Sequence, residues 1–174
     1  MEHNEYRIVD FRIATIHDLH AISSIMQDAV DRMLAEGKKQ WNRSYPTSDH
    51  IAADIKIGAG YIMTDGNNIV AYGAVLLSGE PAYENIRGHW LSDNRYAVIH
   101  RLAVSQKAQG KGVATEFLRN VELYASEKGI DSIRADTNFD NQAMLHLFEK
   151  CGFTYCGEIS YPNGQRLAFE KLIK

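Results

Sequence analysis

One short segment of the chain has the residue types and the spacing that suit the binding of a phosphate group. Residues 109–114 read Gln-Gly-Lys-Gly-Val-Ala, and they follow an apolar, β-branched run over 96–104 that is typical of a buried strand. An amphipathic run over 115–128 predicts a helix directly after the segment. A helix N-terminus preceded by glycines offers free backbone N–H groups and lets the backbone approach an anion closely. We therefore interpret the segment as a pyrophosphate cradle.

Two common nucleotide-binding motifs do not fit this segment. The phosphate loop of nucleoside triphosphatases needs a glycine, four residues and then Gly-Lys-Ser or Gly-Lys-Thr, and the chain has no such run. The dinucleotide-binding fingerprint needs a third glycine, but Ala114 and Thr115 stand two and three residues after Gly112. A Gly-x-Gly pair before a helix is also compatible with an ordinary tight turn.

The segment instead resembles the Gln/Arg-x-x-Gly-x-Gly/Ala signature of the GNAT superfamily, the acyl-CoA-dependent N-acetyltransferases. Gln109, Gly112 and Ala114 occupy its defined positions. Residues 141–153 read Asn-Gln-Ala-Met-Leu-His-Leu-Phe-Glu-Lys-Cys-Gly-Phe, and they resemble a second helix of this family with its Tyr-Glu-Lys-x-Gly-Phe ending. Two motifs in the right order and at the right distance are more specific than either one alone.

The resemblance implies an α/β fold with a mixed, mostly antiparallel sheet of seven strands flanked by about four helices. In this family the central strands splay apart to admit the CoA arm. Hydrophobic periodicity predicts a compatible order of elements within a single domain, 1–174. Strands are predicted over 6–14, 61–64, 69–77, 96–104, 130–135, 153–160 and 165–172, and helices over 19–34, 48–57, 115–128 and 140–150. A long irregular segment, 78–95, lies between the third and fourth strands, and such segments are usually functional or mobile.

The resemblance also implies acetyl-CoA as the cosubstrate and assigns the parts of the chain that bind it. The strand residues Leu102, Ala103 and Val104 would pair with the pantetheine amides and offer N–H groups to the carbonyl oxygen. The pyrophosphate would lie on Gln109, Gly110, Lys111, Gly112, Val113, Ala114 and Thr115. Further contacts would come from Asn138, Asn141, Met144 and Phe148. The two asparagines are equally compatible with loop and helix-cap positions.

The chain departs from the family pattern at the residue that usually donates a proton. The tyrosine of the second motif is replaced by Phe148, which has no hydroxyl group. Tyr161, at the predicted turn of the last hairpin, is a candidate substitute. The alternative is that the thiolate leaves without an acid, because a thiol pKa of about 8.5 makes it a tolerable leaving group.

His100 is the candidate general base for the attacking amine. A histidine with an ordinary pKa of about 6.5 is mostly neutral at pH 7 and ready to accept a proton. His100 lies two residues before Leu102 in the predicted central strand, so strict alternation predicts that the two side chains share one face. The alternative interpretation is a histidine that only stabilises the sheet.

The amine side of the cleft is expected to be bordered by the segments around residues 33–45 and 78–95. Candidate substrate-binding residues there are Trp41, Tyr45, Glu80, Tyr83 and Trp90. The aromatic residues are also compatible with a role in covering the core. Glu80 is also compatible with a solvated surface charge or with a second candidate for the general base. We expect the acceptor to be a primary amine of a small molecule. The first alternative is an acetyltransferase whose acceptor is a protein N-terminus or a lysine. The second is a module that binds acyl-CoA without turnover.

Composition limits the remaining classes. The 174 residues carry a net charge of −3, which gives no general attraction to nucleic acid or to anionic membranes. Cys151 and Cys156 lack a second pair of ligands, so no metal site is expected, and reduced thiols favour the cytoplasm. No apolar run approaches membrane-spanning length. A homodimer is possible.

Overall fold

A mostly antiparallel sheet of eight strands forms the centre of the protein, for which the computed structural model describes residues 9–173. The strands are β1 (Val9–Ile13), β2 (Gly60–Asp65), β3 (Asn68–Leu76), β4 (Arg87–Gly88), β5 (Tyr96–Val104), β6 (Ser132–Thr137), β7 (Thr154–Tyr161) and β8 (Gly164–Leu172). Their order across the sheet is β1-β2-β3-β5-β6-β8-β7-β4. The β5–β6 pair in the middle is parallel, so the chain must cross over between these two strands.

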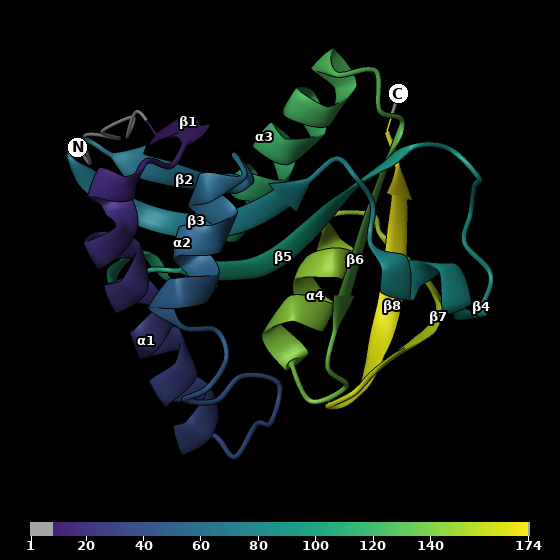
Figure 1. Ribbon diagram of the computed structural model, residues 1–174, viewed down its shortest axis with the longest axis horizontal. Coiled ribbons are helices and arrows are strands. Elements are labelled where there is room, and N and C mark those ends of the chain that lie inside the picture. Colours follow the sequence, from purple (N-terminus) through teal and green to yellow (C-terminus); the bar gives the residue numbers. More distant parts are fainter. Residues whose placement is uncertain (1–8, 174) are drawn as a thin grey trace, which may run out of the picture.

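Four α-helices and three short 3₁₀-helices surround the sheet. They are α1 (Leu19–Ala35), α2 (Ser48–Lys56), α3 (Val113–Glu127) and α4 (Gln142–Lys150), with η1 (Ile16–Asp18), η2 (Pro81–Asn85) and η3 (Gln106–Ala108). The buried faces of α1 and α2 pack together on one side of the sheet, at the left of Figure 1. Those of α3 and α4 belong to the main core on the other side. None of the described helices combines the length and the apolar character that crossing a membrane would require.

The predicted fold class is confirmed, but the predicted number of strands, seven, is wrong. The eighth strand, β4, lies inside the segment that the sequence predicts to be irregular, and it pairs with β7. A side chain on Gly88 or on Gly157 would lie within 2.2 Å of the opposite backbone, so this contact requires two glycines. A two-residue strand has no alternation to detect. The first part of the strand predicted over 6–14 lies outside the described residues.

The central strands separate after a short common ladder. β5 and β6 pair at four positions, from Tyr96 opposite Ser132 to Ile99 opposite Ala135. Beyond Ile99, β5 stays beside β3 as far as Val104, while β6 continues beside β8. Figure 1 shows β5 leaving β6, which is tilted steeply away from it. The pairing therefore leaves one edge of β5 free along 100–104.

A bulge lies in β5 directly after the separation. Tyr72 pairs with Ala103 and Ala74 with His100, so Gly73 alone faces Arg101 and Leu102. Arg101 has a positive φ of 55°, which is uncommon for a residue other than glycine.

The bulge changes which side chains share a face of the sheet. Ile99 and Leu102 both belong to the main core, whereas His100 contacts Glu80 on the opposite side of the sheet. The prediction that His100 and Leu102 share a face is wrong, because the extra residue shifts the alternation by one position.

A buried polar network holds the bulge. Arg101 donates from Nε to Asp54 Oδ2 at 2.8 Å, and its Nη2 donates to the other carboxylate oxygen. Tyr72 donates its hydroxyl to Asp54 Oδ2 at 2.6 Å. The third guanidinium nitrogen of Arg101, Nη1, donates to the hydroxyl oxygen of Tyr45 at 2.9 Å. The bulge thus turns Arg101 toward α2, and all three of its guanidinium nitrogens donate hydrogen bonds.

Candidate active site

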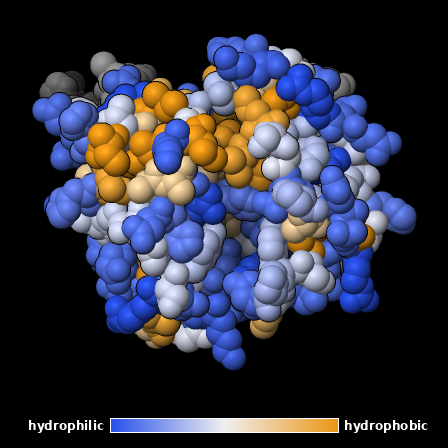
Figure 2. All heavy atoms as spheres, viewed as in Figure 1, coloured by the Kyte–Doolittle hydropathy of each residue, from blue (hydrophilic) through white to orange (hydrophobic). Residues whose placement is uncertain are grey.

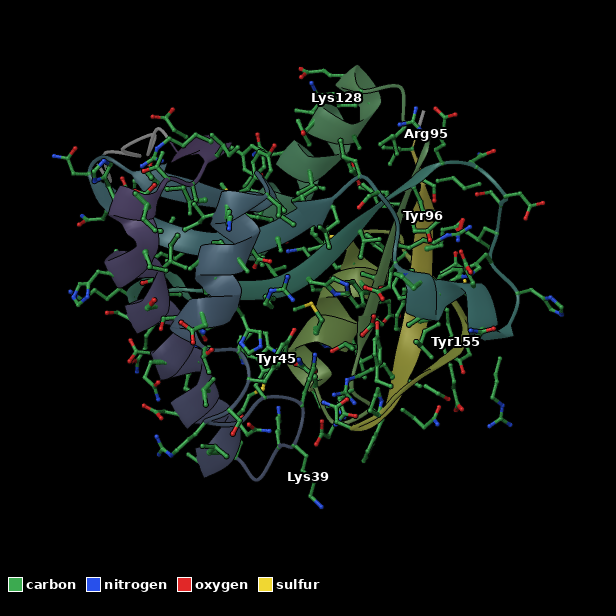
Figure 3. All side chains as sticks on the ribbon, in the orientation of Figure 1. Lys39, Tyr45, Arg95, Tyr96, Lys128 and Tyr155 are labelled. Atoms are coloured by element: carbon green, nitrogen blue, oxygen red, sulfur yellow. The ribbon has the colours of Figure 1, made fainter. Side chains whose placement is uncertain are left out.

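A cavity of about 1020 Å³ opens where β5 and β6 separate. Its walls come from α1 and the loop after it, the free edge of β5, the start of α3, one side of α4 and the β7–β8 turn. Figure 2 shows a hollow near the centre of the face seen in Figure 1, bordered mainly by hydrophilic residues. In Figure 3, Tyr45, which belongs to the loop after α1, lies beside α4, and it lines the cavity. The separation predicted from the family resemblance is therefore present and leads to an open space.

The predicted cradle forms one end of this cavity. Gly110 and Gly112 each have a φ of 75°, and Gly112 is the N-cap of α3. A side-chain carbon added to either glycine would meet no atom within 4 Å, so the space above the backbone is open. α3 begins at Val113, two residues earlier than predicted, and its first amides have no carbonyl one turn before them. The backbone thus fits a pyrophosphate.

Almost all residues of the predicted cradle line the cavity. The lining residues are Gln109, Gly110, Gly112, Val113, Ala114 and Thr115. Lys111 is exposed at the tip of the turn and does not belong to that group. The predicted contribution of Lys111 is therefore the one part of this segment that the lining of the cavity does not include.

The free edge of β5 connects the cradle with the point of separation. Leu102, Ala103 and Val104 all line the cavity, and their β6-facing edge lies beyond the last β5–β6 pair. Such an edge can bind the amides of an extended ligand as an added strand would. Arg32 of α1, which sequence reasoning missed, reaches the same edge and donates from Nη2 to the Val104 carbonyl at 3.4 Å. Its Nη1 atom is buried with no hydrogen-bond partner in the described part of the chain.

His100 lies at the other end of the free edge and forms a pair with Glu80. The distance from His100 Nε2 to Glu80 Oε2 is 3.0 Å, and the two side chains are 15% and 21% exposed. The hydrogen bond from His100 is the main cause that lowers the pKa of Glu80, and burial opposes it. Both residues line the cavity. Two predicted residues that are 20 positions apart in the sequence are therefore brought together.

Tyr161 lines the cavity opposite His100 and shares a carboxylate with a second tyrosine. Its hydroxyl donates to Asp136 Oδ2 at 2.9 Å, and Tyr83 donates to the same oxygen at 2.7 Å. Burial is the main cause that raises the pKa of both tyrosines, and the charge of Asp136 adds to it. Both hydroxyls therefore keep their protons at neutral pH.

Asp136 is the principal site residue that sequence reasoning missed. It is the first residue of β6 beyond the last pair with β5, as His100 is the first such residue of β5. Residues one step beyond a parallel pair point to the same face, so the two side chains share one side of the sheet. The strand reads Ser-Ile-Arg-Ala-Asp-Thr, in which polar and apolar residues largely alternate, so no signal in the sequence distinguished Asp136 from a solvent-facing residue.

The aromatic residues predicted to bind the acceptor occupy different positions. Trp41 and Tyr45 line the cavity, although Trp41 is only 5% exposed. Tyr83 is buried beneath Asp136 and does not reach the cavity surface. Trp90 packs on the guanidinium of Arg134, 4.3 Å from its ring centre, and it donates to the Tyr83 carbonyl at 2.9 Å. The structure thus brings two of these four aromatic residues to the cavity.

The second motif reaches the cavity through α4. Met144 and Phe148 line its wall, and the Phe148 ring packs on Phe153 and Phe169 with centroid distances of 5.1 and 4.9 Å. Phe148 is 3% exposed, so it belongs to the core as well as to the wall. A hydroxyl-free side chain suits this apolar surrounding.

The two asparagines hold the β6–α4 junction together with Gln40, which sequence reasoning did not identify. Gln40 Oε1 accepts from the Asn138 backbone N–H and from Asn141 Nδ2, both at 3.1 Å. Asn141 also caps α4, because its Oδ1 accepts from the Met144 N–H at 3.2 Å. Asn138 donates to Asp140 and does not line the cavity, whereas Asn141 does. The observed contacts are those of caps and loop anchors.

Comparisons with known proteins agree with this geometry. The model of the acetyltransferase (GNAT) family matches residues 23–153. A GNAT-family acetyltransferase structure from Streptococcus agalactiae is 30% identical, with a TM-score of 0.87 and with 95% of this chain and 96% of that chain covered. A putative acetyltransferase structure from Staphylococcus aureus is 28% identical, with a TM-score of 0.71 and with 94% and 99% covered.

Two curated relatives match over shorter stretches. Streptothricin acetyltransferase from Escherichia coli is 34% identical over 64 residues, which is 37% of this chain and 37% of the relative. The probable N-acetyltransferase family 8 member 5 of Mus musculus is 25% identical over 120 residues, 66% of this chain and 52% of the relative. The chain therefore spans about half or less of the curated relatives that it matches. Taken together with the family match over 23–153, the motifs and the divided sheet show that this chain belongs to the GNAT acetyltransferase family.

Proposed function

We propose that the protein transfers the acetyl group of acetyl-CoA directly to a primary amine of a small molecule in the cytoplasm. The observation that carries this proposal is the cavity at the separation of β5 and β6. It has an anion cradle at one end and a histidine and a tyrosine at the other. Acid–base groups are sufficient for such a transfer, so the proposed reaction uses no metal ion.

The chain offers a continuous surface for acetyl-CoA. The backbone of 110–115 would hold the pyrophosphate, with Lys111 at the rim, and the free edge of 102–104 would hold the amide arm. Arg32 would add a positive charge beside that edge. When bound, acetyl-CoA supplies an acetyl thioester, whose carbonyl carbon accepts the amine nitrogen.

The side chains at the far end provide for both proton movements. His100 would accept one proton from the attacking amine as the carbon–nitrogen bond forms. Tyr161 would give a proton to the sulfur as the carbon–sulfur bond breaks. Its raised pKa makes the phenolate that remains a strong base, which would regain a proton from solvent while His100 releases its proton to solvent. Backbone N–H groups on the free edge of β5 would stabilise the negative charge that develops on the carbonyl oxygen. Tyr161 thus takes the place that Phe148 cannot fill.

The polar groups around the acceptor end favour a small amine. Tyr45, Glu80 and Asp136 surround His100 and Tyr161 within one cavity, where a compact substrate can reach them. One curated relative is named for streptothricin as the compound that it acetylates, and that name favours a small-molecule acceptor here as well. We therefore rank small amines before protein N-termini and lysines.

The test is an acetyl-transfer assay on the purified full chain. Acetyl-CoA is mixed with a panel of small amines and with peptides that carry a free N-terminus or a lysine. The released thiol and the mass of each acceptor are then followed. His100→Ala should reduce thiol release by a factor of about 100 or more. His20→Ala, an exposed histidine of α1 outside the cavity, is the matched control and should leave the rate unchanged.

Three outcomes would contradict the proposed function. Tight binding of CoA in calorimetry, with no thiol release on any amine, would indicate a module that binds acyl-CoA without turnover. Equal rates in His100→Ala and His20→Ala would remove His100 from the reaction. Acetylation of the peptides alone, with no small amine acetylated, would show that the acceptor is a protein and not a small molecule.

A further inference from the structure

The segment between β3 and β5, which the sequence predicts to be irregular, supports the acceptor end of the cavity. Its 3₁₀-helix η2 and the preceding residue supply Glu80, which contacts His100, and Tyr83, which contacts Asp136. Each contact joins this segment to the first residue of β5 or β6 beyond their common ladder. We infer that Glu80 is a positioning residue: it fixes the ring of His100 so that Nδ1 is the atom that accepts the proton of the amine. This inference rests on the proposed function.

The carboxylate of Glu80 is itself held in place. Glu80 is the N-cap of η2, and its Oε1 accepts from the Ala82 N–H at 3.3 Å. Pro81 occupies the first position of η2, where its fixed φ favours the start of a helix. The other oxygen, Oε2, lies 3.0 Å from His100 Nε2. Both oxygens of the carboxylate are therefore engaged, and its direction is set by the backbone.

The contact determines which nitrogen of the imidazole carries the proton. An ionised carboxylate only accepts hydrogen bonds, so Nε2 must be the protonated nitrogen of a neutral His100. Nδ1 then has a free lone pair, and it has no hydrogen-bond partner within residues 9–173. His100 lines the cavity, where a bound amine would meet this nitrogen. Once Nδ1 has taken a proton, the negative charge of Glu80 stabilises the cation.

The other charged and titratable groups around the pair have different partners. The ring of Tyr83 from η2 lies 6.4 Å from that of His100, but its hydroxyl donates to Asp136 of β6. Tyr161 from β7 donates to the same carboxylate. Arg101 from β5 also lowers the pKa of Glu80, but its guanidinium is bound by Asp54 of α2 and by Tyr45 of the loop after α1. Glu80 is thus the carboxylate that His100 contacts directly.

The experiment compares Glu80→Gln with Glu84→Gln in the chain described above. Glutamine keeps the size and an acceptor oxygen, but it removes the charge and adds an N–H donor. Glu84 lies on the same 3₁₀-helix and is exposed, so its variant controls for a general change of charge. Nitrogen-15 NMR of the imidazole reports which nitrogen carries the proton without any turnover. The values of kcat and KM are measured in parallel with an amine that the wild-type chain acetylates.

We expect the Nε2–H form in the wild-type protein at high pH. The amide of Glu80→Gln can present its N–H group as well as its oxygen to Nε2, so the Nε2–H form should lose its exclusive preference and NMR should show a mixture of the two tautomers. In the same variant kcat should fall about tenfold while KM changes little. Glu84→Gln should change neither the tautomer nor kcat. Glu80→Asp keeps an ionised acceptor on a shorter side chain, so it should keep the Nε2–H form and lose less of kcat.

The possible failures are distinguishable. An Nδ1–H form in the wild-type protein, or the same tautomer in the two glutamine variants, would overturn the positioning role of Glu80 even if the wild-type chain acetylates amines. The expected tautomers together with no thiol release on any amine would leave the contact in place and refute the proposed function. A changed tautomer in Glu80→Gln with an unchanged kcat would show that His100 is not the base, and the inference would fail.

Discussion

The substitution Asp54→Asn tests whether the bulge of β5 depends on a single buried carboxylate. Asp54 accepts hydrogen bonds from two nitrogens of Arg101 and from the hydroxyl of Tyr72. The side chains of Asp54 and Arg101 are 6% and 14% exposed, so water does not replace a lost partner. Asparagine removes the charge and turns one acceptor oxygen into a donor that faces other donors.

The expected loss of stability follows from this burial. Removing one partner of a buried ion pair costs about 3–5 kcal/mol, because the remaining charge has no compensation. Asparagine keeps one acceptor oxygen, so we expect the lower end of that range, about 3 kcal/mol. With a urea m-value of about 2 kcal/mol/M, the unfolding midpoint should fall by about 1.5 M.

Urea unfolding followed by tryptophan fluorescence is the assay. Trp41 is 5% exposed and belongs to the core cluster formed by α1 and α2, so it reports on the region that contains Asp54. Asp49→Asn is the matched control: it removes an exposed carboxylate from the first turn of the same helix and should cost about 0.5 kcal/mol. Equal midpoints in the two variants would refute the reasoning. If Asp54→Asn does not fold, Tyr72→Phe removes one of the three hydrogen bonds and should cost about 1–2 kcal/mol.

Tyr161→Phe keeps the ring but removes the proposed proton donor, so kcat should fall by about 100-fold while calorimetry shows unchanged CoA affinity. A variant with full kcat would contradict the role of the hydroxyl. Gly112→Ala forces a side chain into a φ of 75° in the cradle, and CoA affinity should fall about tenfold. Gly129→Ala, with a φ of 73° at the other end of α3, should bind CoA normally, and equal losses in both variants would argue against the cradle. The hydrogen bond from Arg12 lowers the pKa of Asp18 from 3.8 to about 2, so this exposed pair stabilises the fold above the unfolded pKa and loses its effect as pH falls through about 2. Asp18→Asn should therefore flatten that part of the acid-unfolding curve, and an unchanged curve would show that the pair contributes nothing.

Much of the fold could be predicted because its signals are local. The repeat of apolar residues predicted α1, α2 and α4 close to their observed bounds, since a helix buries side chains that are three or four positions apart. The glycine turn before α3 was equally accessible to prediction, because Gly110 and Gly112 take left-handed φ values within one short turn. β4 gave no such signal. Its two residues form a strand only because β7 lies beside them.

The candidate site was only partly predictable, because its partners come from distant segments. His100 and Glu80 were each singled out, but their contact depends on η2 folding back over the end of the β5–β6 ladder. Asp136 was missed, since its role depends on Tyr83 and Tyr161, which approach it from two other elements. Long-range pairs of this kind have no fixed spacing in a sequence.

The amino-acid sequence alone determined the family, the order of most elements and the position of the glycine turn before α3, because these depend on neighbouring residues and on short motifs. The tertiary structure decided how the residues of β5 face the cavity. A bulge at Arg101 is stable only where Gly73 faces it and Asp54 binds the guanidinium, and both lie on other elements. That one extra residue places Leu102 in the core and His100 on the opposite side of the sheet. Side-chain alternation is a property of a regular strand, and only the neighbouring strand determines where the regularity ends.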